Sequence, residues 1–181
     1  MVKNLIILFM SIYLAGCASG AKLEYMAYQG SKNDYPIELK NNVEVSSVVG
    51  GIKTNSLAKS EISNGAFLGA LKKSLLSQGL FSEKGKYQLA AKIMRVDQPL
   101  VGGFNMEVTT HVVYILTDSS NSKIIFKEKI ISSYTASATD AFIGANRLRL
   151  ANEGSGKNNI ELFLKKISSL NIRKKEITLT E

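Results

Sequence analysis

The sequence is poor in the residues that build cross-links and metal sites. It holds one cysteine, one histidine, two prolines and no tryptophan among 181 residues. A lone cysteine excludes a framework of internal disulfides, and the shortage of cysteine and histidine excludes a Cys/His zinc cluster and most multi-histidine metal sites. Two prolines exclude a proline-rich linker and a collagen-like chain. We therefore predict that the protein holds no metal and needs no cofactor.

The abundant residues indicate one folded domain. Hydrophobic residues make up 45% of the chain and charged residues 21%, a composition that supports a packed core and argues against wholesale disorder. A chain of 181 residues has the length of one ordinary domain with short tails. The formal net charge is +8, which is compatible with nucleic acid, with anionic lipid or with no specific partner.

Residues 1–16 have the features of a secretion signal. Lys3 precedes a run of mostly apolar residues from Leu5 to Leu14. This run is too short to cross a bilayer, which takes about 20 residues. A positive charge followed by a short apolar region is typical of a signal peptide.

The apolar run ends in Leu14-Ala15-Gly16-Cys17, which resembles the lipobox of bacterial lipoproteins. We predict cleavage between Gly16 and Cys17 and lipidation of the Cys17 thiol. The alternative is an ordinary signal peptide with an incidental cysteine. Several acyl chains would anchor the protein firmly, because each buried CH₂ contributes roughly 0.8 kcal/mol.

The residue after the cysteine predicts the location. It is Ala18 rather than aspartate, which resembles the outer-membrane default of lipoproteins. We therefore expect a lipid-anchored protein on the periplasmic side of the outer membrane of a Gram-negative bacterium. Export in turn excludes nucleic acid as a partner.

The rest of the chain divides into three parts. Residues 17–36 hold the lipidated cysteine followed by a polar, patternless stretch, which predicts a flexible tether. Residues 37–172 predict a single folded domain. Residues 173–181, which begin with an Arg-Lys-Lys run, predict a basic, frayed tail.

Hydrophobic periodicity predicts four strands and two helices in the folded domain. The strands show β-branched runs or strict alternation, and the helices carry apolar residues three or four positions apart. Ser63 is placed to cap the first helix and Gly79 to end it. The expected elements are a strand at 38–49, a helix at 63–79, strands that start at Tyr87, Met106 and Ile124, and a helix at 145–170.

This β-α-β-β-β-α order predicts an α+β fold. Helices with one apolar stripe each and a sheet with one apolar face should form a two-layer sandwich, with both helices on one face. The three consecutive strands should form an antiparallel meander, and the first strand should pair in parallel through its helical crossover. We therefore predict a mixed, mainly antiparallel sheet of four strands.

Two short patterns resemble enzyme motifs, and each has a more ordinary explanation. Ser56-Leu57-Ala58-Lys59 matches the S-x-x-K of penicillin-binding enzymes but lacks their companion motifs. Residues 154–157, Gly-Ser-Gly-Lys, lack the first glycine and the final serine or threonine of a phosphate-binding loop. They also fall inside a predicted helix, where the glycines would allow a close approach or a kink.

His111 lies in the middle of a predicted strand, on the face that also carries Glu107 and Thr109. Such a row can imitate a catalytic arrangement, but it is typical of the solvated face of an antiparallel sheet. With no second histidine and no nucleophile in register, we predict no catalytic residue.

The last predicted helix carries the residues for which we expect a structural role, namely Arg147, Arg149, Asn152 and Glu153. A helical projection places Glu153 on the side of the apolar stripe, one turn from Arg149 and from Lys157. A carboxylate that faces a core is costly unless it is paired. We therefore predict that Glu153 forms a partly buried ion pair or accepts N–H groups from the loop at 135–143, and so fixes that loop to the helix.

Basic residues on the same helix form a candidate binding surface, made of Lys157, Lys165 and Lys166. Anionic lipid headgroups, lipopolysaccharide phosphates and peptidoglycan carboxylates are the acidic partners available in the envelope. The alternative is an ordinary solvated helix face.

Several stretches within residues 38–170 together resemble a group of uncharacterised proteobacterial lipoproteins. They include 96–99, 107–109, 134–136, 140–144 and 147–154, and the run R-L-R-L-A-N-E-G is the most specific. Some members are named UDP-N-acetylglucosamine acyltransferase, an activity of hexapeptide-repeat β-helices, and no such repeat occurs in this chain. The β-α-β-β-β-α order is also similar to the lipopolysaccharide-assembly lipoprotein of the outer-membrane translocon and to auxiliary lipoproteins of lipid-transporting ABC systems.

Three hypotheses of function follow. We favour a non-enzymatic outer-membrane lipoprotein that assists an envelope transport or assembly system by binding a protein partner or a lipid headgroup. The second is a module that binds peptidoglycan or regulates a cell-wall synthase. The third is a transferase that acts on an acyl or sugar group, which the lack of a catalytic arrangement disfavours.

Overall fold

The computed structural model describes residues 18–55, 59–100 and 103–172. The predicted signal peptide, Cys17, Ser56 and the tail at 173–181 lie outside the described residues. The elements are, in chain order, α2 (Leu23–Met26), η1 (Ile37–Leu39), β1 (Val43–Val49), α3 (Asn64–Ser77), β2 (Tyr87–Asp97), β3 (Asn105–Asp118), β4 (Lys123–Ser137) and α4 (Gly144–Ser168).

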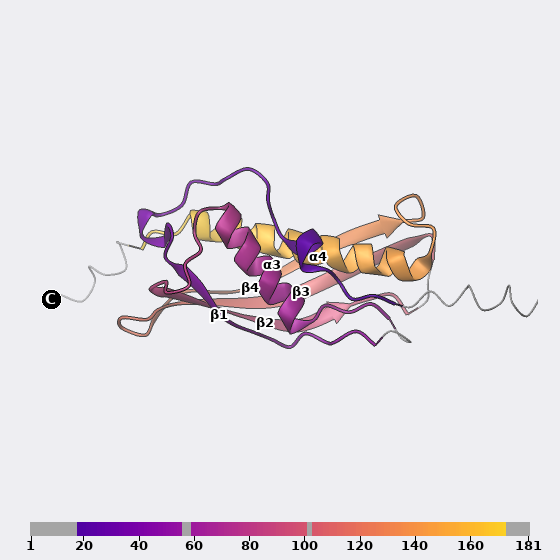
Figure 1. Cartoon of the computed structure of the whole chain (residues 1–181), viewed down its shortest axis with the longest axis horizontal. Helices are drawn as coiled ribbons and strands as arrows, with labels where there is room; N and C mark the ends of the chain where they lie inside the picture. Colours follow the sequence, from indigo (N-terminus) through magenta and orange to yellow (C-terminus); the bar gives the residue numbers. More distant parts are fainter. Residues whose placement is uncertain (1–17, 56–58, 101–102, 173–181) are drawn as a thin grey trace, which may run out of the picture.

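The strands form one sheet in the order β1-β2-β3-β4. β1 pairs in parallel with β2 across the crossover helix α3, and β2, β3 and β4 pair antiparallel as a meander. Helices α3 and α4 pack against the sheet as the second layer (Figure 1). The predicted α+β sandwich with a mixed, mainly antiparallel sheet is confirmed.

The core lies between the helices and the inner face of the sheet, which is the face that packs against α3 and α4. Alternation along β3 sends Val112 and Tyr114 inward, because successive side chains of a strand point to opposite faces. Tyr114 stacks on Phe163 of α4, with ring centroids 4.3 Å apart. Ile160 and Ile167 are fully buried on the same side of α4, as their spacing predicts. Full burial of a side chain of this size stabilises the fold by roughly 1.5–3 kcal/mol.

Helix α3 begins and ends where the sequence predicts. The Ser63 hydroxyl oxygen accepts the N–H of Ala66 at 3.2 Å and so satisfies one of the free donors of the first turn. Gly79 follows the helix with a φ of +72°, a left-handed conformation that glycine adopts without a Cβ penalty. The chain then turns back, and the N–H of Leu80 binds the carbonyl of Leu75 at 2.9 Å.

Strand β1 is shorter than predicted. It starts at Val43 rather than at residue 38 because η1 and Asn41, with a φ of +50°, turn the chain before it. β4 runs further than predicted, to Ser137, since its polar end still pairs with β3. Ladder hydrogen bonds continue there although the apolar alternation that marks the strand has ended.

The prediction of a flexible tether at residues 18–36 is wrong. This segment crosses α3 and α4 (Figure 1), and α2 contacts both helices. Met26 is fully buried, and Ala27 and Tyr35 are buried with it in the core. The N–H of Tyr28 binds the Ser74 hydroxyl at 2.8 Å. The anchoring residues are spaced irregularly between polar ones, so they leave no periodic signal, and the folded domain includes this segment.

Candidate functional site

The predicted structural residues of α4 lie at one end of the sandwich, which we call the loop end. Residues 103–104, which precede β3, and the β4–α4 loop (138–143) meet there at Arg147, beside the start of α4. Figure 1 shows the β4–α4 loop and the start of α4 at the right-hand end, where the described chain also begins. The opposite end, where α4 finishes, we call the far end.

Arg147 holds the two loops of the loop end together. Its Nη1 donates to the carbonyl oxygens of Gly103 and Phe104 at 2.7 and 2.9 Å, and its Nη2 donates to that of Phe142 at 3.3 Å. The side chain is largely buried, and in the described part of the chain it makes no ion pair. Backbone carbonyls cannot change charge, so this arrangement positions loops and offers no proton transfer.

Asn152 joins α4 to the segment that precedes α3. Its Nδ2 donates to the carbonyl of Ser60 at 2.9 Å. Gln98 donates through Nε2 to the same carbonyl and to Asn152 Oδ1, both at 2.9 Å. These hydrogen bonds join Asn152, Gln98 and the Ser60 carbonyl in one cluster that fixes the end of β2, while Gln98 Oε1 has no partner among the described residues.

Glu153 is buried beside Arg149, with 4.0 Å between Oε1 and the guanidinium Nε. This agrees with the predicted partly buried pair. The backbone donor differs, because Oε1 accepts the N–H of Lys22 at 3.0 Å and not one from the 135–143 loop. Arg147 holds that loop instead. Glu153 therefore fastens the N-terminal segment, for which the sequence predicts a flexible tether.

Burial raises the pKa of Glu153 above its ordinary value, although the Lys22 N–H and the Arg149 charge act in the opposite direction. Its second oxygen, Oε2, has no hydrogen-bond partner among the described residues. A carboxyl group that is partly desolvated takes up a proton more readily than a free one. This property makes the stability of the fold depend on pH, and the polar contacts of Glu153 among the described residues are the Lys22 N–H and Arg149.

A band of polar residues that sequence reasoning missed continues along the inner face. Asn159 of α4 donates to the carbonyls of Thr110 and Ile130, both at 3.1 Å. It also accepts the hydroxyl of Tyr114 at 2.9 Å. Ser155, one turn earlier, donates to Thr110 Oγ1 at 3.0 Å. Polar residues at inward positions of β3 and α4 were the available signal, but the alternation of apolar residues obscured it.

The glycines of the 154–157 stretch allow close packing, as expected. A Cβ on Gly154 would lie 2.3 Å from ring atoms of Tyr134 in β4, and one on Gly156 would lie 2.9 Å from Met26 Sδ. The stretch is helical throughout, which is incompatible with a phosphate-binding loop. The close approach at Gly156 is what allows α2 to sit on α4.

His111 lies on the outer face of the sheet, opposite the helices, as predicted. Its Nε2 lies 3.0 Å from Asp97 Oδ2 and 3.3 Å from Arg95 of β2. Arg95 and Asp97 also pair directly, at 2.8 Å. Nδ1 of His111 has no partner among the described residues. The trio is a cross-strand charge cluster and brings no serine, threonine or cysteine into a relay with the imidazole.

The three candidate lysines do not form one continuous basic patch. Lys166 pairs with Glu128 of β4. Lys157 and Lys165 are exposed on the same side of α4, but the exposed Glu161 stands between them, since residues four apart share a helix face. Any anion on this helix would meet a carboxylate as well.

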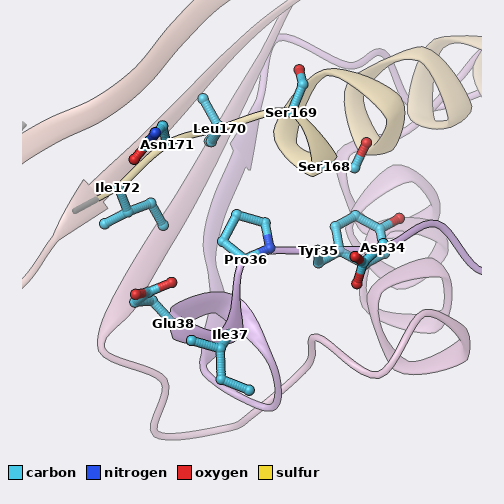
Figure 2. A pocket seen from close by; sticks show the side chains of 10 residues that line it. All are labelled: Asp34, Tyr35, Pro36, Ile37, Glu38, Ser168, Ser169, Leu170, Asn171 and Ile172. Atoms are coloured by element: carbon cyan, nitrogen blue, oxygen red, sulfur yellow. The ribbon is translucent and has the colours of Figure 1, made fainter. Parts of the chain in front are cut away.

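The pockets are open hollows. One of about 360 Å³ at the loop end is lined by Pro99, Leu100 and Leu148 among others. A second, of about 460 Å³, lies beside Tyr134 and Lys157. Figure 2 shows a third, of about 490 Å³, at the far end between residues 34–38 and 168–172. Its polar side chains include Asp34, Glu38, Ser168, Ser169 and Asn171, and Asp34 pairs with Lys40.

The described residues contain no group of three His, Cys, Asp or Glu side chains that could hold a metal ion. None of their helices is both long and apolar enough to cross a bilayer.

No family model and no curated protein matches this chain in sequence. Solved structures match its fold. A protein from Chlamydia trachomatis described as hypothetical has a TM-score of 0.54 at 11% identity, over 72% of this chain and 97% of that one. A Xanthomonas campestris protein assigned to the family DUF330 has a TM-score of 0.52 at 11% identity, over 84% and 98%. A candidate lipoprotein from Caulobacter crescentus has a TM-score of 0.51 at 14% identity, over 73% and 90%. Likeness at this level of identity shows a shared fold.

Proposed function

We propose that this protein is a lipid-anchored accessory protein of the bacterial envelope that works by binding and not by catalysis. In this proposal Cys17 carries the lipid, the outer membrane holds it, and the domain faces the periplasm. The observation that carries the proposal is the sequence Leu14-Ala15-Gly16-Cys17 directly before a folded domain that starts near residue 21. A structural neighbour described as a candidate lipoprotein is consistent with it.

The polar groups of the domain support a binding role. The side chains of Arg147, Asn152 and Asn159 form hydrogen bonds with backbone carbonyls and neighbouring amides. Such bonds fix loops and layers and leave no activated nucleophile or paired acid and base, which a transferase would require. The buried Glu153 likewise binds a backbone group, the N–H of Lys22.

The outer face of the sheet is the surface that we assign to the protein partner, a component of an envelope transport or assembly system. Its edge strand β4 exposes Ile124 and Ile131, and the register of β3 and β4 puts Lys127 and Lys129 between them. Exposed aliphatic side chains among charges are typical of the surface of a transient interface. β4 is also an unpaired edge that could accept a strand.

Labelling with palmitate tests the anchor. The wild-type protein should incorporate the label and fractionate with the outer membrane, and Cys17→Ala should do neither. Equal labelling of both proteins would refute the proposal.

Site-specific photocrosslinking tests the binding face. A photocrosslinking residue at Lys129, on the outer face, should capture an envelope protein in intact cells. The matched control is the same residue at Leu76, which is exposed on α3 at the opposite side of the domain. Capture at Leu76 and not at Lys129 would show that the partner binds the layer of α3 and α4 instead of the outer face of the sheet.

A further inference from the structure

The most exposed large apolar side chains of the described residues gather in one place. Leu100, Phe104 and Phe142 keep 87% or more of their surface exposed, and the next most exposed, Leu76, keeps 65%. Ile143, beside Phe142, is also exposed. Scattered apolar residues are normal on a protein surface, but a group of the largest ones marks a contact site. We call these four residues the apolar tip.

The apolar tip is held in one place by the loop end. Arg147 binds the carbonyls of Phe104 and Phe142 with a single guanidinium group, so the two loops are fixed side by side. Leu100 lines the same hollow as Gly144 and Leu148 at the start of α4. The tip therefore presents its side chains from a rigid base, which limits the entropy lost on binding.

The chain that leads to Cys17 leaves the domain at this same end. The N–H of Ala21 binds the carbonyl of Glu61 at 3.0 Å. The neighbouring residues Lys59 and Ser60 line the hollow that contains Leu100. Ala18, the first described residue, is bonded directly to Cys17, and consecutive Cα atoms lie about 3.8 Å apart.

We propose that the apolar tip inserts into the lipid interface of the membrane that holds the anchor. This inference rests on the proposed lipidation of Cys17, and it adds that the domain makes a second contact with the bilayer. A short connection to the anchor makes that contact intramolecular, so a modest apolar surface is sufficient. Large apolar side chains at loop ends bury themselves among headgroups and upper acyl chains as the apolar side of an interfacial helix does.

The second contact would fix the orientation of the domain. α4 has 25 residues and so extends for about 37 Å away from the loop end. The far end would then lie away from the membrane. The outer face of the sheet would be accessible to a protein partner. A domain held by the anchor alone would lack this fixed orientation.

The absence of tryptophan from the chain allows a direct test. Phe142→Trp introduces a single tryptophan into the lipidated full-length mature protein, which is reconstituted in vesicles of phosphatidylethanolamine and phosphatidylglycerol. Its emission should shift to the blue and should be quenched by brominated lipid. The matched control is Ile37→Trp, an exposed position at the far end, whose emission should not change. Unchanged emission of Phe142→Trp in vesicles would overturn the inference.

Vesicle binding by the mature chain with Cys17→Ser separates the tip from the anchor. This unlipidated chain should bind the same vesicles weakly, and Leu100→Ser/Phe104→Ser/Phe142→Ser should weaken the binding by about tenfold or more. The effect should persist in about 0.5 M NaCl, because it is apolar and not ionic. Leu76→Ser is the control and should bind as the parent does.

Palmitate labelling, tryptophan emission and vesicle binding together distinguish failure of the anchor from failure of the tip. Absence of palmitate refutes the proposed lipidation, whatever the emission shows. A normal anchor with equal vesicle binding by the triple variant and its parent refutes the tip. A blue shift of Phe142→Trp that appears without vesicles and grows with protein concentration would assign the tip to a second copy of the chain, and would also overturn the inference.

Discussion

The two ends of the sandwich differ in which side chains they bury and which they expose. At the loop end a guanidinium group is buried on backbone carbonyls, while Phe104 and Phe142 project outward. At the far end Tyr35 and Leu39 are buried, and charges lie in pairs such as Lys86 with Asp118 at 2.9 Å. The far end follows the usual distribution of a soluble domain, whereas the loop end inverts it.

This difference suggests a separate role for each end: the far end stabilises the domain, and the loop end makes contact outside it. The far end needs no partner to explain its side chains, because exposed apolar residues such as Ile37 stand singly there and its charges include pairs such as Lys86 with Asp118. Leu100, Phe104 and Phe142 of the apolar tip are almost fully exposed and so contribute little to the packing of the domain, and the buried guanidinium of Arg147 holds the loops in place. An end arranged in this way is explained by what it contacts outside the molecule.

The largest effect should come from removing residues 18–36. A chain that starts at residue 37 loses the buried side chains of Met26, Ala27 and Tyr35 and leaves the core open between α3 and α4. Burial of each large side chain contributes roughly 1.5–3 kcal/mol, a large part of the stability of a small domain. We expect the chain from residue 37 to lose cooperative thermal unfolding or to melt more than about 10 °C below the chain from residue 18. Equal melting temperatures for the two chains would show that residues 18–36 are a flexible tether after all.

Arg147→Ala should have the next largest effect. It leaves the carbonyls of Gly103, Phe104 and Phe142 without their common donor, and a buried polar group left unpaired costs about 1–3 kcal/mol. We expect a lower Tm and faster hydrogen exchange in both loops of the loop end. Arg147→Lys should restore part of the loss, because one ammonium group cannot reach all three carbonyls as the planar guanidinium does. Exchange that stays unchanged in both loops would show that other contacts hold them.

Glu153 should make stability depend on pH. Its folded-state pKa is raised by burial, so the folded protein binds the proton more tightly than the unfolded chain does. Stability is then highest below the unfolded pKa and falls as the pH rises through the folded pKa. Glu153→Gln should remove this fall, so that its Tm gains on the wild type from about pH 4 to about pH 8. The control is Glu161→Gln, an exposed position on the same helix, whose Tm should follow that of the wild type at every pH. A curve of Tm against pH for Glu153→Gln that runs parallel to that of the wild type would contradict the prediction.

Glu153→Ala should be destabilising at neutral pH, because it removes the acceptor of the Lys22 N–H and loosens the N-terminal segment. Lys165→Ala should be nearly neutral, since Lys165 is exposed on α4. A variant Glu153→Ala that melts like the wild type yet loses its partner in a pull-down would make the segment a binding site.

Among the variants that break a contact, the smallest effect should come from the far end. Lys166→Ala breaks the pair with Glu128, in which both side chains are more than a third exposed. Exposed ion pairs contribute about 0–1 kcal/mol, so the Tm should fall only slightly and less in high salt. A loss as large as that of Arg147→Ala would contradict the comparison of the two ends.

The regular part of the fold could be predicted from the sequence, because buried side chains recur there at the period of a strand or of a helix. Val112 and Tyr114 alternate along β3, Ile160 and Phe163 recur along α4, and Ser63 and Gly79 mark the ends of α3. The N-terminal segment could not be predicted in this way, since Met26 and Tyr35 are single anchors in polar sequence. Nothing local indicates that they pack against α3 and α4.

The candidate site was predicted in its residues but not in all of its contacts. The position of Glu153 on the apolar side of α4 indicated burial, and its neighbour Arg149 followed from helical spacing. Arg147 binds the carbonyls of Gly103 and Phe142, which lie 39 residues apart in sequence, and backbone acceptors cannot be recognised from a sequence. The apolar tip is likewise visible only once the loops are placed side by side.

Hydrogen exchange of the lipidated protein, with and without a bilayer, tests the central claim most directly, because it reports on both ends at once. The account predicts that the membrane protects the backbone N–H groups of Gln98, Leu100 and residues 103–104 and 138–143, and leaves those of residues 34–35, 37–38 and 168–172 unchanged, since Pro99 and Pro36 carry no N–H. Protection at the far end, or equal exchange at the loop end in the presence and absence of the bilayer, would contradict it.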